Sequence, residues 1–286
     1  MLASPSLRGV LAVGACCLAG ALTLLAAPQT AASHRCVAIV DIRTADAWKS
    51  NAAECAARLS PASTFKIPHA LVALETGAIA PDTVEKWDGT QYAEQPNWNR
   101  DQTLASALRP SVVWFFQRIA PRVGAARMHE WLQRLRYGNA STSGDVTMYW
   151  LNGTLRVSPV EQAAFLGQLY RGRLPFAADR VRLVRDALEQ PFGTAENANG
   201  MMQLEGPRPP GVTWRPKTGR TSVDGRPVSW LVGDVTIAGR GYAFASAVWR
   251  DDQIPIGPAE AAQLAVNTLA GRGLLGSTSK PLSSGR

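Results

Sequence analysis

The order of strand-like and helix-like segments is the feature that most constrains this fold. An apolar, β-branched run at residues 36–42 has the character of a strand. Helical patterns follow, and the strand pattern returns in three consecutive segments, 212–218, 229–237 and 242–249. A last helical pattern covers residues 258–269. Strands from both ends of the chain must therefore share one sheet. The sequence predicts an α+β fold, with an antiparallel sheet flanked by helices and an all-helical lobe inserted between its strands.

The middle of the chain supplies that helical lobe. Its helical patterns lie at residues 104–109, 111–120, 125–136, 159–174 and 177–188, and one further helical pattern, at residues 63–75, precedes the lobe. We expect one domain over residues 33–275, with a sheet lobe from residues 33–80 and 206–275 and a helical lobe over about 81–205. Residues 276–286 are expected to form a flexible polar tail.

Residues 1–32 have the pattern of a cleaved secretory signal peptide. Arg8 is the lone charge before an almost continuous apolar stretch from Val10 to Ala27, and Thr30-Ala31-Ala32 offers small residues for cleavage. An uncleaved membrane anchor is one alternative, but the stretch is short for a span of about 20 residues. Lipidation at Cys16 is another, since Val13-Gly14-Ala15-Cys16 resembles a lipobox. We expect secretion to the periplasm without a stable membrane anchor.

Two cysteines, Cys36 and Cys55, remain after removal of the signal peptide. They bracket a segment that reads as two strands joined by a polar turn, in a compartment that favours disulfides, so they either form a disulfide or stay free. The three histidines, His34, His69 and His129, lack the close spacing of a metal motif, and we expect no metal site.

The charge of the chain is positive but scattered. The formal net charge is +8, and only five of the 30 basic residues are lysines. The arginines stand singly among acidic and apolar residues, with no basic run and no interleaved aromatic residues. This pattern is typical of a solubilising surface, and we expect no nucleic-acid partner.

Ser63 and Lys66 are the first candidates for chemistry. In the sequence Ser63-Thr64-Phe65-Lys66 they stand three residues apart at the start of a helical pattern, so they share one face of the helix. A serine hydroxyl needs an adjacent base to act as a nucleophile. A lysine can be that base only when apolar burial lowers its pKa. The ordinary alternative is an N-cap serine beside a solvated lysine.

Lys217-Thr218-Gly219 is the second candidate, placed at the end of a strand and before a polar turn at residues 221–226. A lysine and a threonine at a strand edge can hold a carboxylate, and Gly219 lets a ligand approach the backbone closely. The ordinary alternative is a strand end followed by a turn glycine. The pattern S-x-x-K followed by K-T-G is the signature of penicillin-binding proteins and class A β-lactamases.

The chain most resembles the class D (oxacillinase-type) serine β-lactamases. Pro61 to Ile67 is similar to the nucleophile motif of that family, in which Phe commonly precedes the lysine. The resemblance covers about residues 36–275 and implies the serine β-lactamase/DD-peptidase-like fold. The other matching segments, in chain order, are Ser111-Val112-Val113, Tyr137-Gly138-Asn139, Trp150 within Tyr149-Trp150-Leu151, Lys217-Thr218-Gly219 and Trp230-Leu231-Val232-Gly233.

The resemblance implies hydrolysis of β-lactam antibiotics through an acyl-enzyme on Ser63. In the class D family the lysine is carbamylated by CO₂, so Lys66 would carry a carbamate and act as general base for acylation and deacylation. Trp150 would hydrogen-bond that carbamate, Ser111 would relay a proton to the lactam nitrogen, and Lys217 would steer the substrate carboxylate. No other cofactor is expected.

The resemblance also implies a set of substrate-binding residues. Val113, with Phe65, would keep the lysine dry, and Thr218 would hold the carboxylate beside Lys217. The backbone N–H groups of Ser63 and Arg220 would form the oxyanion hole. The full substrate-binding set is Val113, Leu151, Thr218, Gly219 and Arg220.

One position departs from the family pattern. Many class D enzymes carry a carboxylate-binding arginine near the start of the last helix, and Gly257 stands where we expect it. Arg250 or Arg220 would replace that arginine, or carboxylate binding would rest on Lys217 and Thr218.

Three rival functions are compatible with parts of this pattern. A penicillin-binding DD-peptidase shares the chemistry of Ser63 and Lys66 but stays acylated by β-lactams. A β-lactam sensor domain is acylated without turnover, and a general binding protein would carry the motifs by accident. Tyr137-Gly138-Asn139 and Trp150 favour the β-lactamase. We expect β-lactams as the small-molecule partners and a monomer or a homodimer.

Overall fold

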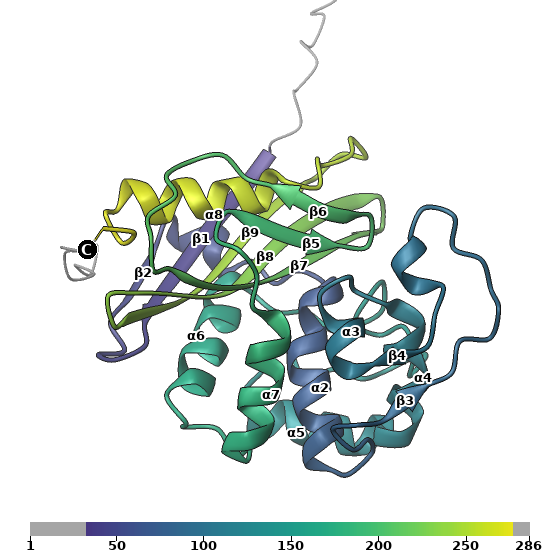
Figure 1. The fold of residues 1–286 in the computed structure, drawn as a ribbon. Coiled ribbons are helices and arrows are strands. Elements are labelled where there is room, and N and C mark those ends of the chain that lie inside the picture. The colour runs from purple at the N-terminus through teal and green to yellow at the C-terminus, as the bar shows by residue number, and fades with distance from the viewer. Residues whose placement is uncertain (1–32, 277–286) are drawn as a thin grey trace, which may run out of the picture. The chain divides into compact units, whose positions relative to one another are not determined.

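The central sheet is assembled from both ends of the chain. The computed structural model describes residues 33–276, which the ribbon shows in colour (Figure 1). Five strands pair antiparallel in the order β2-β1-β9-β8-β7. β1 pairs with β9 along its length, from Ser33 opposite Arg250 to Asp41 opposite Tyr242. The predicted fold class is therefore confirmed. The strands are β1 (Ser33–Asp41), β2 (Ala47–Lys49), β7 (Thr213–Val223), β8 (Arg226–Ile237) and β9 (Arg240–Arg250).

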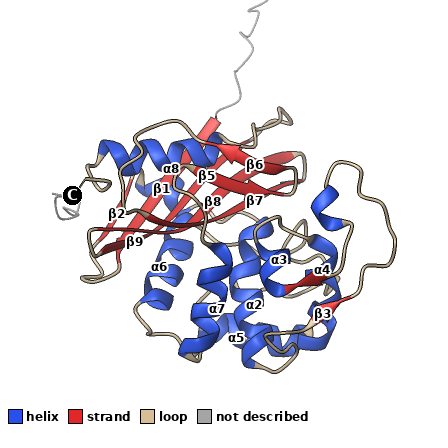
Figure 2. Cartoon of the chain, in the orientation of Figure 1, coloured by secondary structure: helices blue, strands red, loops and turns tan. Residues whose placement is uncertain are grey.

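Each face of the sheet is buried under helices. Successive side chains of a strand point to opposite faces, so Cys36 and Ala38 of β1 join the core on the helical side. Val37 and Ile39 join the core under α8 (Glu260–Gly271). Figure 2 shows α8 on one face of the sheet and the group of helices on the other. Trp214 and Phe244, whose rings stack 5.1 Å apart, fill the core beneath α8.

The remaining helices and short strands lie between β2 and β7 in the chain. Helix α2 runs through their core: all its residues from Lys66 to Leu74 are buried. Within the described residues, no helix combines the length and the apolar character that a membrane span requires. The helices are α1 (Ala52–Ala56), the 3-10 turn η1 (Ala62–Phe65), α2 (Lys66–Glu75), the 3-10 turn η2 (Pro96–Trp98), α3 (Leu104–Leu108), α4 (Val113–Val123), α5 (Ala125–Arg134), α6 (Pro159–Tyr170) and α7 (Ala178–Leu188). The short strands are β3 (Val84–Glu85) with β4 (Gln102–Thr103), and β5 (Thr194–Asn197) with β6 (Gly200–Gln203).

Several boundaries of the predicted elements are wrong, and two of them lie at the site residues. β7 does not end at Thr218 but continues to Val223, because its pairing with β8 extends to a two-residue turn. That turn is Asp224-Gly225, with φ of 52° and 73°, the conformation that favours Asp-Gly in tight hairpins. Helix α4 begins at Val113 instead of Ser111, since Ser111 has φ of 58° and stands outside the helix.

Two segments assigned by sequence to the helical lobe contact the sheet. In α6, Gly167 lies against β1, where an added Cβ would come within 2.9 Å of Val40 Cγ1. In β5, the backbone oxygen of Glu196 accepts a hydrogen bond of 3.1 Å from Thr218 Oγ1 of β7. The division into two lobes stays a prediction. The predicted signal peptide and nearly all of the predicted tail lie outside the described residues.

Cys36 and Cys55 form a disulfide that joins β1 to α1, with their Cα atoms 5.2 Å apart. Both residues are fully buried. The bond closes a loop that contains β2 and the turn before it, so it restricts this part of the chain in the unfolded state.

We expect replacement of both cysteines by serine to lower the free energy of unfolding by about 3 kcal/mol, as for loops of similar length. Urea denaturation of the parent and the double variant measures this loss. Reductant should destabilise the parent and leave the variant unchanged. Equal urea midpoints for the two proteins would contradict the expected contribution.

Candidate functional site

A strained turn positions the candidate nucleophile. Ser63 lies in the 3-10 turn η1, directly before α2. The preceding residue, Ala62, has φ of 49°, a left-handed conformation that residues other than glycine rarely adopt. Thr64 Oγ1 donates a hydrogen bond of 2.7 Å to Pro61 O, which closes the turn. The turn therefore holds Ser63 at the start of a fully buried helix.

Lys66 lies one turn further along and points back to Ser63. Its Nζ is 2.7 Å from Ser63 Oγ and 5.3 Å from the centre of the Phe116 ring. The side chain is 0% exposed, and burial, followed by the charge of Lys217, lowers the pKa of Lys66 well below its ordinary value. A lysine in this environment is available as a neutral base beside a hydroxyl.

A second lysine–serine pair faces the first. Lys217 Nζ donates a short hydrogen bond to Ser111 Oγ and a second of 2.9 Å to Thr218 O. Burial lowers the pKa of Lys217 to about 7, although the nearby Glu196 raises it. Ser111 adopts its left-handed conformation in the segment between α3 and α4. The site thus contains two serine hydroxyls, and each contacts a lysine amine whose pKa is lowered by burial.

Trp150 packs against Phe65 and His69 and has a polar group without an acceptor among residues 33–276. Its ring is fully buried, 5.9 Å from the ring of Phe65. Within residues 33–276, its Nε1 has no hydrogen-bond partner. A buried donor of this kind is uncommon and points to an acceptor that the polypeptide does not supply.

His69 is a buried residue of this site that sequence reasoning considered only as a metal ligand. Its ring lies 5.3 Å from that of Trp150 and 5.5 Å from that of Phe116. Burial, with the charge of Lys66, lowers the pKa of His69 to about 3. The signal in the sequence was its spacing: at three residues from Lys66 it shares the same face of α2.

A cavity of about 340 Å³ opens onto both serines. Of the predicted residues, Ser63, Ser111, Thr218, Gly219 and Arg220 line it. Lys66 and Lys217 are buried and contact the serines without lining the cavity. The buried Trp150 and the partly buried Val113 and Leu151 do not line it either. Residues that the sequence did not single out complete the wall: Glu94, Gln95, Asn197, Ala198, Asn199 and Pro258.

Gly219 allows β7 to pass directly against the nucleophile turn. A Cβ at this position would lie 2.9 Å from Thr64 Cγ2 and 3.1 Å from Pro61 O. Both distances are shorter than ordinary contacts, so a side chain would push the strand away from the turn. The glycine thereby keeps Thr218 and Arg220 next to Ser63.

The Tyr137-Gly138-Asn139 segment supports the site from outside the cavity. Tyr137 OH donates to Gln162 Oε1 at 2.9 Å, and Gln162 Nε2 donates to Thr64 Oγ1 at 2.8 Å. Asn139 exchanges hydrogen bonds with the backbone of Arg156, both of 2.9 Å. Gln162 of helix α6 therefore links this segment to the turn that carries the nucleophile.

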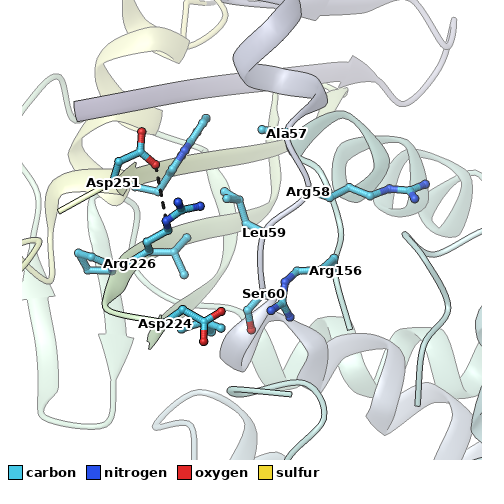
Figure 3. Close-up of a pocket in the computed structure, with 12 residues that line it drawn as sticks. Ala57, Arg58, Leu59, Ser60, Arg156, Asp224, Arg226 and Asp251 are labelled. Atoms are coloured by element: carbon cyan, nitrogen blue, oxygen red, sulfur yellow. Dashed lines mark ion pairs between the residues drawn. The ribbon is translucent and has the colours of Figure 1, made fainter. Parts of the chain in front are cut away.

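A different cavity, of about 280 Å³, lies between the segment Ala57–Ser60 and the ends of β7, β8 and β9 (Figure 3). It contains charged residues of both signs, including Arg226 and Asp251, whose Nε and Oδ1 are 4.0 Å apart. None of the residues predicted from sequence for chemistry lines it. The cavity at Ser63 is therefore the candidate active site.

Comparison with known proteins places these features in a family. The model of the penicillin-binding protein transpeptidase domain matches residues 28–268. The chain is 34% identical over 192 residues to the probable beta-lactamase YbxI of Bacillus subtilis (strain 168), which is 67% of this chain and 65% of YbxI. The chain thus spans slightly less than two thirds of this curated relative.

Solved structures match over a larger share of their length. A class D beta-lactamase from Bacillus subtilis is 30% identical with a TM-score of 0.70, covering 85% of this chain and 93% of that structure. The C-terminal domain of the Bacillus licheniformis BlaR penicillin-receptor is 27% identical with a TM-score of 0.71, covering 85% and 91%. The recognised resemblance is confirmed by these matches.

Gly138→Ala tests the support role of the Tyr137-Gly138-Asn139 segment. Gly138 has φ of 55°, and a Cβ there would lie 1.9 Å from Arg156 O. Gly144 is a matched control, because its φ is 92° with no atom within 4 Å of an added Cβ. We expect Gly144→Ala to lower the free energy of unfolding by about 1 kcal/mol, because of its positive φ alone. Gly138→Ala should lower it by at least about 2–3 kcal/mol more, because the added Cβ also overlaps the backbone of Arg156. Urea denaturation measures both, and equal losses would contradict this role.

Proposed function

Because the chain belongs to the class D serine β-lactamases, within the penicillin-binding protein transpeptidase family, we propose that it hydrolyses β-lactam antibiotics through an acyl-enzyme on Ser63. The observation that carries the proposal is the 2.7 Å contact between Ser63 Oγ and the buried Lys66 amine, at the wall of a cavity. No surface role explains why a lysine should be fully buried at that distance from a serine.

The two lysine–serine pairs support an assignment of proton transfers for acylation. The base on Lys66, which is its carbamate when CO₂ is bound, accepts the Ser63 proton as Oγ forms a bond to the lactam carbonyl carbon. The carbonyl C–N bond then breaks, and Ser111 delivers a proton to the departing nitrogen. Lys217, in its protonated form, then gives a proton back to Ser111. The pKa of Lys217, about 7, is suitable for this transfer. The backbone N–H groups of Ser63 and Arg220 are our candidates for binding the oxyanion.

The surroundings of Lys66 fit a CO₂-derived carbamate. Only an unprotonated amine reacts with CO₂, and the lowered pKa of Lys66 provides one. The buried Trp150 Nε1, which lacks an acceptor within residues 33–276, is the donor that would hold the carbamate oxygen. When bound, the carbamate supplies an anionic general base for both half-reactions.

Arg220 is our candidate for binding the substrate carboxylate. Its side chain is exposed at the wall of the cavity, next to Thr218. The other candidate arginine, Arg250, donates two hydrogen bonds to Asp252, of 2.7 and 2.9 Å, and does not line the cavity. Lys217 is buried and engaged with Ser111, which supports a role in proton transfer more than in carboxylate binding.

One second function has a specific observation in its favour. The similarity to the C-terminal domain of the BlaR penicillin-receptor is compatible with a domain that is acylated once. A DD-peptidase would also remain acylated. Hydrolytic turnover separates the proposed β-lactamase from both.

We further propose that the protein acts in the periplasm. The pattern of residues 1–32 supports export, and the Cys36–Cys55 disulfide suits an oxidising compartment. Whether the enzyme is a monomer or a homodimer stays a prediction.

Nitrocefin hydrolysis tests the proposed function. We expect the purified protein to hydrolyse many equivalents and Ser63→Ala to hydrolyse none above the uncatalysed rate, because the acyl-enzyme forms on that hydroxyl. One equivalent consumed, with a stable adduct in the mass spectrum, would indicate a sensor or a DD-peptidase. No reaction would contradict the assignment of the site.

Bicarbonate dependence tests the state of Lys66. As pH falls, protonation of the carbamate would release CO₂ and leave Lys66 as an ammonium group, which cannot react with CO₂ again. We therefore expect activity to decline at low pH and to be restored by added bicarbonate. With ¹³C-labelled bicarbonate, the parent should show a carbamate signal that Lys66→Ala lacks. Lys86→Ala, which removes an exposed lysine, is the control and should keep the signal. Indifference to bicarbonate would contradict the carbamate.

A further inference from the structure

Two side chains of opposite charge line the cavity at Ser63. Among the described residues of its wall, Glu94 and Arg220 are the charged ones. Both are exposed, and neither side chain has an ion-pair partner within residues 33–276. The lysines of the site are buried, with pKa values lowered by burial. The charges that a bound molecule meets at the wall are therefore one carboxylate and one guanidinium.

The two charges lie on different walls. Arg220 belongs to β7 and follows Thr218 and Gly219, which also line the cavity. Glu94 belongs to the segment between β3 and β4. A molecule that contacts β7 with one end can thus extend toward Glu94 with the other.

The segment that carries Glu94 is braced by hydrogen bonds, which fix the backbone from which its side chain extends. Asn99 Oδ1 accepts from Tyr92 N at 2.9 Å, and Asn99 Nδ2 donates to Tyr92 O at 3.3 Å. Trp98 Nε1 donates to Pro110 O at 3.0 Å, which ties the segment to the residues beside Ser111. Asn199 Nδ2, 3.5 Å from Glu94 O, adds a contact from the β5–β6 hairpin.

We infer that this site favours zwitterionic β-lactams, which carry a carboxylate on the ring system and an ammonium group on the acyl side chain. The ring carboxylate meets Arg220 and the side-chain ammonium meets Glu94. In a bicyclic β-lactam these two groups lie at opposite ends of the nucleus, and the two charges of the cavity come from two different segments of its wall. The inference rests on the proposed function and specifies its substrate class.

The expected selectivity is modest and sensitive to salt. Both residues are exposed, and exposed ion pairs change an equilibrium by about two- to fivefold. Salt screens such pairs, so the preference should weaken as ionic strength rises. The chain's net charge of +8 favours anionic substrates in general, and a preference for an ammonium must therefore come from a local carboxylate.

Three penicillins with the same phenyl side chain test the inference. Benzylpenicillin has no charge at the α-carbon, ampicillin has an ammonium group and carbenicillin has a carboxylate. The assay is run at about pH 6.5, where an α-amino group is protonated. The quantity measured is kcat/KM for each, expressed relative to benzylpenicillin.

We expect Glu94→Gln to lower the ampicillin ratio about two- to fivefold and to raise the carbenicillin ratio by a similar factor. Glu94→Lys should change both ratios in the same directions by larger factors. Arg220→Gln should lower kcat/KM for all three substrates alike, because each carries the ring carboxylate. Glu130→Gln removes the same charge from the exposed surface of α5, outside the cavity, and should leave the ratios unchanged.

The outcomes are distinct. Changes in the Glu94 variants that exceed those of Glu130→Gln, and that fade in high salt, support the inference. Equal ratios in the parent and Glu94→Gln overturn it while the proposed function stands. Absence of turnover of all three penicillins by the parent overturns the proposed function instead.

Discussion

The burial of two lysine side chains is the constraint on which the site depends. Lys66 and Lys217 are 0% and 1% exposed, and within residues 33–276 each makes hydrogen bonds to hydroxyl or carbonyl oxygen without a carboxylate partner. Burial disfavours the ammonium form of both side chains, so the pKa of Lys66 is well below its ordinary value and the pKa of Lys217 is lowered to about 7. The aromatic residues around Lys66 are thus part of the chemistry, because they determine the protonation state of the base.

Two of the residues with strained backbone lie at the two serines. Ala62, directly before Ser63, and Ser111 itself both have positive φ, which costs on the order of 1–3 kcal/mol each. The rigid packing of α2 on one side and the contact of β7 through Gly219 on the other offset this strain. The fold holds both hydroxyls in conformations that a flexible loop would abandon.

Sequence spacing and family resemblance predicted different parts of this site. Helical periodicity alone brought Ser63 and Lys66 together, because three residues make nearly one turn. The placement of Ser111 and Lys217, 106 residues apart, in one site followed only from the family resemblance, and the hydrogen bond between them was not predicted. The β5–β6 hairpin was missed because each of its strands has only four residues, although Asn199-Gly200 is a turn signal. Glu94 lies in an irregular polar segment where no periodicity marks a functional residue.

The position of β7 at the edge of the sheet has a consequence for how the cavity can change. β7 pairs with β8 on one side only, and its residues Thr218, Gly219 and Arg220 reach the cavity on the other. An edge strand presents main-chain N–H and C=O groups that a flat amide ligand can use as an added strand would. Point mutations replace side chains and leave these groups in place. Changes in the lining residues can therefore alter which ligand substituents the cavity accepts. The hydrogen bonds between the ligand and the backbone of β7 would stay the same.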